Sequence, residues 1–322
     1  MNNFDNNAEL NDEIDLRDLL GVLWLNKKFI LIFTILTTLL IALYSLSLTN
    51  IYSAQTLMAP TSSSKSSSLL SQYSGLASMA GIQLPQNGGD NQIDIALELV
   101  KSKKLLDRLM LYETFLPDLF ASKSWNMQTN TISYDRALYD NENNQWVRKV
   151  SPPLKQVPSS QEALIEFSKL VSISQDQKTQ LVTLNVDHLS PVVAQQWSIW
   201  IVKEINAILA NMEISNSQAS IDYLHNQIKI TPYAELRTMF YKLIQESTQS
   251  MMLAGVNSEY ILTTIDPPVI SENKSQPQRL FICILAALFG GMLSILIIFT
   301  RRYGFKKEDE LDIFKLYSYN WS

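Results

Sequence analysis

Two uncharged apolar runs, one near each end of the chain, constrain its fold more than any other feature. The first covers residues 29–48 (FILIFTILTTLLIALYSLSL) and the second covers residues 280–300 (LFICILAALFGGMLSILIIFT). A helix of about 20 residues crosses a hydrocarbon core of about 30 Å. The Leu, Ile and Phe residues of each run together favour insertion by roughly 4–8 kcal/mol. We therefore predict two transmembrane helices with a polar segment between them.

A cleaved signal peptide and a buried core helix are the alternatives for these runs. The first run follows a long polar leader, residues 1–28, and exceeds the 7–15 apolar residues of an ordinary signal peptide. The second run is too long and too free of charge to be typical of a soluble core helix. Both runs are expected to remain in the protein as membrane spans.

The charges that flank the runs predict how the chain crosses the membrane. Lys27 and Lys28 precede the first run, and Arg301 and Arg302 follow the second. Cytoplasmic flanks are enriched in Lys and Arg, so both termini are predicted to be cytoplasmic. Arg279, on the other side, can extend its charge to the interface. The expected division is a cytoplasmic segment with an interfacial helix at 1–28, spans at 29–48 and 280–300, an outer domain at 49–279 and a cytoplasmic tail at 301–322.

Charge and cysteine content exclude several classes of protein. The formal net charge is −5, and no segment is basic enough to hold nucleic acid. The single cysteine, Cys283, lies in the second run, so no disulfide is expected in the outer domain. His188 and His225 alone do not make a structural zinc site. No metal and no cofactor is expected.

Apolar periodicity and turn residues predict a mixed α+β outer domain. A mobile loop is expected at 61–89 and an irregular insertion with short strands at 117–158. The expected regular elements are strands at 51–60 and 260–265, a helix at 93–112, a hairpin of strands at 170–174 and 181–186, and a long helix at about 190–254.

The long helix has a clear start and an uncertain middle. Ser190 and Pro191 are a typical N-cap and first helical residue. Pro232 either kinks one helix or, with Thr231, begins a second. Gly255 is the expected end. Apolar positions near the proline follow a heptad-like rhythm, which fits packing within one chain and contact between subunits equally well.

Few residues suggest a specific role. No nucleotide-binding, hydrolase or metalloprotease motif is present. The carboxylate pair Asp140 and Glu142 fits a glycosidase but is weak evidence alone. Gly290 and Gly291 could let the second span approach another helix closely, in the same chain or a partner. The candidate coupling residues between the outer domain and this span are Pro267, Pro268 and Pro277, since proline stiffens the backbone.

Several segments, in order along the chain, resemble one family. They are IDLRDLLGVLWLNKK before the first span, YSAQTLMAP after it, DHLSPVVAQQWSIWIVKEIN, LIQESTQSMMLAGVNSEYILTTIDPP, and a glycine-containing second span that ends in Arg-Arg. This order resembles the Wzz-type chain-length determinants, which are polysaccharide co-polymerases of the Gram-negative inner membrane. The proline-rich segment before the second span is thin here, and the insertion at 117–158 is long.

The resemblance implies a fold and a role. It implies two transmembrane helices that flank a periplasmic α/β base domain with a long projecting helix, assembled into ring-like homo-oligomers. It also implies regulation of the chain length of O-antigen or a related glycan in lipopolysaccharide biosynthesis, together with a Wzy-type polymerase and lipid-linked polysaccharide. Members of the family are not enzymes. A separate cytoplasmic kinase partner is left open.

Two other functions remain as alternatives. A two-span sensor or adaptor subunit would bind a periplasmic ligand, but it needs a cytoplasmic output module that the short terminal segments are not expected to contain. A membrane-tethered glycan hydrolase would need two carboxylates about 5–10 Å apart in a pocket.

Overall fold

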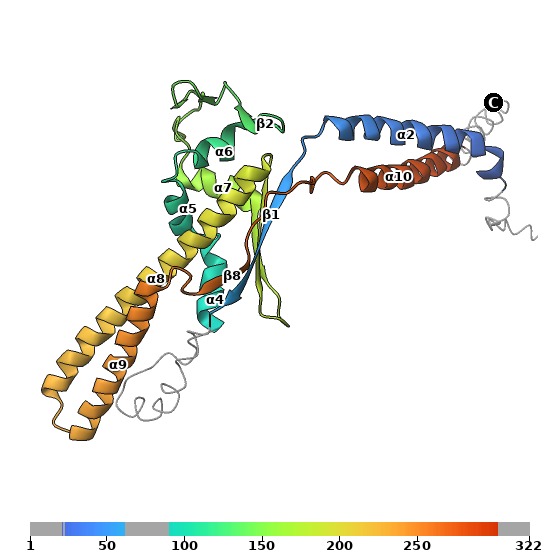
Figure 1. The fold of residues 1–322 in the computed structure, drawn as a ribbon. Coiled ribbons are helices and arrows are strands. Elements are labelled where there is room, and N and C mark those ends of the chain that lie inside the picture. The colour runs from blue at the N-terminus through green and yellow to red at the C-terminus, as the bar shows by residue number, and fades with distance from the viewer. Residues whose placement is uncertain (1–20, 22, 62–89, 302–322) are drawn as a thin grey trace, which may run out of the picture. The chain divides into compact units, whose positions relative to one another are not determined.

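The computed structural model describes residues 21, 23–61 and 90–301 of the 322-residue chain (Figure 1). It is a mixed α+β protein that divides into two compact units, one of Met1–Leu48 with Gln276–Ser322 and one of Thr49–Ser275. The loop expected at 61–89 and most of the expected interfacial helix lie outside the described residues.

The first unit contains the two apolar runs as helices. Helix α2 (Lys27–Ser47) and helix α10 (Arg279–Phe299) each have 21 residues and lie side by side (Figure 1). Both are long and apolar enough to cross a membrane. Many of their large apolar side chains, such as Leu36 and Leu288, are more than half exposed, as expected of helices that face lipid.

A four-stranded antiparallel sheet forms the base of the second unit. Its order is β6 (Val171–Gln175), β7 (Val182–His188), β1 (Tyr52–Pro60) and β8 (Leu262–Asp266). The expected hairpin is confirmed as β6–β7. Along β7 every second side chain is buried, which places one face of the sheet on the core and leaves the other face polar.

Helix α8 (Pro191–Ile230) packs its first half against the buried face of the sheet. Its predicted start is confirmed, since the Ser190 hydroxyl accepts a hydrogen bond from the Val193 N–H. Trp197 of α8 is fully buried, with the Phe115 ring 4.8 Å away. The elements around this core are α4 (Asp90–Leu99), α5 (Lys103–Leu109), α6 (Phe115–Ala121) and α7 (Ser160–Leu170).

The helix expected over 190–254 is two helices. Helix α8 ends at Ile230, and α9 (Ala234–Val256) folds back beside it (Figure 1). Pro232 stands in the link because it lacks the N–H that a continuing helix would use. The prediction that the helix ends at Gly255 was wrong by one residue, since α9 continues to Val256. Leu224 of α8 is buried against Met239, Phe240 and Leu243 of α9, so the heptad-like positions pack within the chain.

Two other helices differ from expectation. The helix predicted over 93–112 is divided into α4 and α5, because the Ser102 hydroxyl accepts from the Leu105 N–H and starts a new helix. Helix α7 was not predicted, although Ser159 and Glu162 form a capping box at its start. His188 is a strand-end residue as predicted, but it is buried.

A buried asparagine joins α8 to the start of β8. Asn206 is 1% exposed, and its Oδ1 accepts from the N–H groups of Ile261 and Leu262, both at 3.0 Å. Its Nδ2 donates to the carbonyls of Leu262 at 3.0 Å and Val202 at 3.2 Å. Every polar atom of this amide is therefore paired, and two backbone donors depend on it.

Substituting Asn206→Ala should lower the free energy of unfolding by ~2–4 kcal/mol, because two buried backbone N–H groups lose their acceptor. Urea denaturation followed by tryptophan fluorescence measures the change. Asn211→Ala, at an exposed position of the same helix, is the control and should change little. Equal effects of the two substitutions would contradict this role of Asn206.

A buried polar chain ties the insertion of residues 117–158 to the sheet. The Tyr134 hydroxyl donates to Asp118 Oδ1 at 2.6 Å. His188 Nδ1 accepts from the Ser190 N–H, so its Nε2 carries the proton and donates to the Asp118 carbonyl oxygen at 3.1 Å. Burial raises the pKa of the Asp118 carboxyl to about 6 and lowers the pKa of His188.

The raised pKa of Asp118 predicts a pH-dependent stability. An exposed Asp in the unfolded chain ionises near pH 3.8, so between that value and about 6 the folded state binds the proton more tightly and loses stability as the pH rises. Asp118→Asn should therefore stabilise the protein relative to wild type by ~2–3 kcal/mol more at pH 7 than at pH 4.

Asp140→Asn is the control for the sign of this effect. Hydrogen bonds, chiefly from the Asn143 side chain, lower the pKa of Asp140, so its substitution should act in the opposite direction. Denaturation curves at both pH values give the comparison. An Asp118→Asn effect that is the same at pH 4 and pH 7 would contradict the account.

Candidate functional site

The close approach of α2 and α10 centres on a glycine predicted from the sequence. A Cβ added to Gly290 would lie 3.3 Å from Thr37 Cβ and 3.7 Å from Thr34 Cα, and it would clash with the Thr37 hydroxyl. Only glycine therefore fits at this distance between the helices. At Gly291 an added Cβ would meet Thr34 Oγ1 at 3.8 Å, which is an ordinary contact. The two glycines are thus not equivalent.

The buried face of this helix pair is made mostly of small residues, with Ile298 of α10 as a large buried side chain beside them. Gly290, Ala286 and Ser294 of α10 and Ser45 of α2 are buried. The Ser294 hydroxyl donates to the Gly291 carbonyl of its own helix at 2.7 Å. Such surfaces hold membrane helices together by close backbone packing.

The three candidate coupling prolines are divided between the two units. Pro267 and Pro268 follow β8, and Pro277 precedes α10. Pro268 is buried, and its carbonyl oxygen accepts from Gln195 Nε2 of α8 at 2.9 Å. Pro267 is exposed and Pro277 is half-buried. The segment after β8 is therefore fixed to α8 at Pro268.

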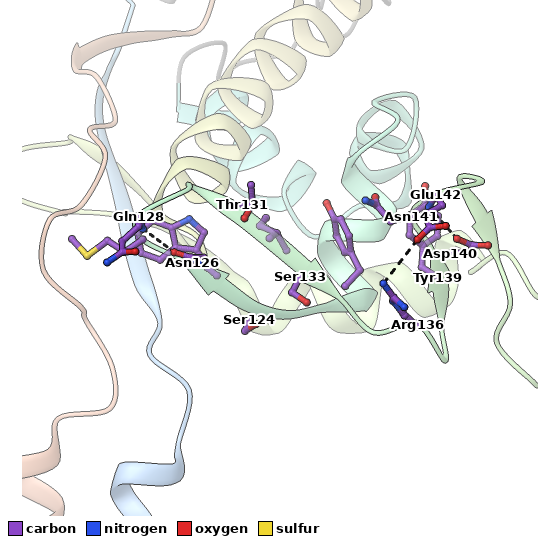
Figure 2. A pocket seen from close by; sticks show the side chains of 14 residues that line it. Ser124, Asn126, Gln128, Thr131, Ser133, Arg136, Tyr139, Asp140, Asn141 and Glu142 are labelled. Atoms are coloured by element: carbon purple, nitrogen blue, oxygen red, sulfur yellow. Dashed lines mark hydrogen bonds and ion pairs between the residues drawn. The ribbon is translucent and has the colours of Figure 1, made fainter.

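A polar groove, which the sequence did not predict, lies on the insertion (Figure 2). It has a volume of about 810 Å³ and is lined by the hairpin of β2 (Ser122–Asn126) and β3 (Thr131–Tyr134) and by residues 136–142. The labelled side chains follow the hairpin from Gln128 at one end to Asp140 and Glu142 at the other. Its sequence signal is a pair of short strands in which polar and aromatic residues alternate.

The carboxylate pair considered for a glycosidase lies in this groove. Asp140 accepts hydrogen bonds from the Glu142 N–H at 3.0 Å and from Asn143 Nδ2 at 2.8 Å. The hydrogen bond from the Asn143 side chain, followed by those from the backbone N–H groups of Glu142 and Asn143, lowers the pKa of Asp140. A glycosidase needs one carboxylic acid with a raised pKa as its proton donor. Asp140 has the opposite shift, so it is unsuited to that role.

The glycine contact between α2 and α10 predicts different outcomes at adjacent positions. Gly290→Ala should lower the melting temperature of the detergent-solubilised protein, because overpacking of this kind costs ~1–3 kcal/mol. Gly291→Ala is the matched control and should have little effect. Adding Thr37→Ala to Gly290→Ala should recover part of the loss, since it removes the clashing hydroxyl. Equal losses at the two glycines would contradict this packing.

Comparison with known proteins finds a family that part of the chain resembles. Residues 12–111 match the family model "Wzz: Chain length determinant protein", a region that includes α2, β1, α4 and α5. No curated protein sequence matches the chain.

Two solved structures show distant similarity. A full-length bacterial polysaccharide co-polymerase is 13% identical with a TM-score of 0.35, over 96% of this chain and 100% of that one. A fragment of WzzB, a polysaccharide co-polymerase from Salmonella Typhimurium, is 10% identical with a TM-score of 0.27, over 70% of this chain and 100% of that one. Over residues 12–111, about a third of its length, the chain is therefore similar to the chain length determinant proteins.

Proposed function

We propose that this protein regulates the chain length of a cell-surface polysaccharide, as a homo-oligomeric co-polymerase beside a Wzy-type polymerase in the inner membrane. The glycan is O-antigen or a related polymer built from lipid-linked repeats. The observation that carries the proposal is the match of residues 12–111 to the chain length determinant family. The two apolar helices and the α+β unit between them agree with this role.

The ends of the second unit support a periplasmic location for residues 49–279. The Ser275 N–H donates to the Ile51 carbonyl oxygen at 2.8 Å, and Ser275 Oγ accepts from the Ser53 N–H at 3.1 Å. The chain therefore enters and leaves this unit at one point. Two spans that begin at one point would enter the same face of a membrane, and the charge rule then favours a cytoplasmic location for both termini.

The hairpin of α8 and α9 supports assembly with other copies. Its apolar cluster is small, and several large apolar side chains remain exposed along it, among them Ile230, Tyr233 and Val256 at 73%, 65% and 83%. Ile230 and Tyr233 lie together at the tip of the hairpin, and Val256 ends α9. Contact with another copy would remove such side chains from water. A ring of subunits would cover them.

The prolines supply a mechanical link in this proposal. Pro268 is held on α8 through Gln195, and the chain from there to α10 is short and contains Pro277. Proline restricts the backbone of this link, and the close packing at Gly290 would couple any movement of α10 to α2. Regulation would then depend on geometry and partner contact rather than on catalysis.

Deletion of the gene should redistribute the ladder of surface polysaccharide bands on a gel, while polymer is still made. This follows because a length regulator biases when extension stops and does not form the glycosidic bond. A plasmid copy of the gene should restore the original distribution. An unchanged ladder would contradict the proposal, and complete loss of polymer would point to an enzyme of synthesis instead.

A further inference from the structure

We propose that the groove on the insertion binds an uncharged stretch of a polysaccharide chain. The groove is lined by the β2–β3 hairpin and residues 136–142 (Figure 2). The identity of the ligand, a polysaccharide, rests on the proposed function. The location of the site rests on the side chains that line the groove.

The groove presents polar groups that are free to bind a ligand. The side chains of Ser124, Gln128, Ser133 and Asn141 line it, are exposed, and make no hydrogen bond to any residue that the structure describes. Amides and hydroxyls both donate and accept, so together they match the hydroxyl groups of sugars. Apolar ligands would gain little from such a surface.

An aromatic ring stands among these groups in a fixed orientation. Trp125 is half-buried, its Nε1 donates to Asn130 Oδ1 at 3.0 Å, and its ring packs edge-on against Tyr52 with centroids 5.3 Å apart. Aromatic side chains combine a flat apolar face with a polar handle. A sugar ring has a matching apolar face of C–H groups, so an indole held in this way suits it.

The rest of the groove is also held in place before a ligand arrives. Asn126 Oδ1 accepts from the Gln128 N–H at 2.9 Å, which fixes the hairpin turn. At the other end, Asp140 accepts a hydrogen bond from the Asn143 side chain, which fixes the turn over residues 140–143. The Tyr134 hydroxyl is held by its hydrogen bond to Asp118. A preformed site loses less entropy when it binds a flexible chain.

The charges in the groove favour a neutral ligand over an anionic one. Arg136 is its one basic residue, and its guanidinium lies 3.9 Å from a Glu142 carboxylate oxygen. Together Asp140 and Glu142 carry two negative charges against the single positive charge of Arg136, so the groove has a net charge of −1. Nucleic acid and phosphate-rich polymers require the opposite balance. The labelled side chains extend along the hairpin from Gln128 to Asp140 and Glu142 (Figure 2), an arrangement that suits a chain better than a compact small molecule.

Calorimetric titration of the full chain in detergent tests the inference, with lipid-free polysaccharide released by mild acid from the same cells as the probe. Wild type should bind it, and the double variant Gln128→Ala with Asn141→Ala should bind at least tenfold more weakly. The matched control removes two exposed amides from α8, Asn211→Ala with Asn216→Ala, and should bind like wild type.

Three results would overturn the inference. They are no binding by wild type, equal binding by the groove variant, and displacement of the glycan by an unfolded polypeptide, carboxymethylated lactalbumin. The last would make the groove a polypeptide site. If glycan binding fails while gene deletion still alters the ladder, only this inference is lost. An unaltered ladder removes the proposed function and leaves the binding result standing.

Discussion

The hydrogen bond from the Ser275 N–H to the Ile51 carbonyl oxygen is the constraint on which the rest of the account depends. It joins residues that are far apart in the sequence and adjacent to the two apolar helices. Because β1 begins at Tyr52, directly after Ile51, one of the two central strands of the sheet starts where both membrane connections meet. The proposed topology, the proposed location of residues 49–279 and the proposed role of the prolines all use this junction.

The second unit is organised around helix α8. With 40 residues it is about 60 Å long, and different parts of it serve different contacts. Its first half carries Trp197 and Asn206, which pack on the sheet and hold β8. Within the described residues, its second half packs on α9, with a small apolar cluster between them. Such a helix can link a stable base to a surface that is available to other subunits.

Local chemistry made much of this fold predictable, and long-range contacts explain what was missed. Ser190 and Pro191 predicted the start of α8, and the turn residues between β6 and β7 predicted their hairpin. Both signals act between residues that are close in the sequence. The reversal after Ile230 was left open, since Pro232 is compatible with a kink or a break and only packing of Leu224 on α9 decides it.

The Ser159–Glu162 capping box was a sequence signal for helix α7 that the prediction missed. The groove could not be predicted, because the β2–β3 hairpin and residues 136–142 come together only in the folded chain. The coupling role of the prolines remains a prediction.

The most direct test of the account is the location of the two termini. Reporter fusions at the N-terminus and the C-terminus, each made of an enzyme active on only one side of the membrane, give the result. Because both spans leave the unit at the Ile51–Ser275 junction, both reporters should show a cytoplasmic location. Termini on opposite faces would contradict the account.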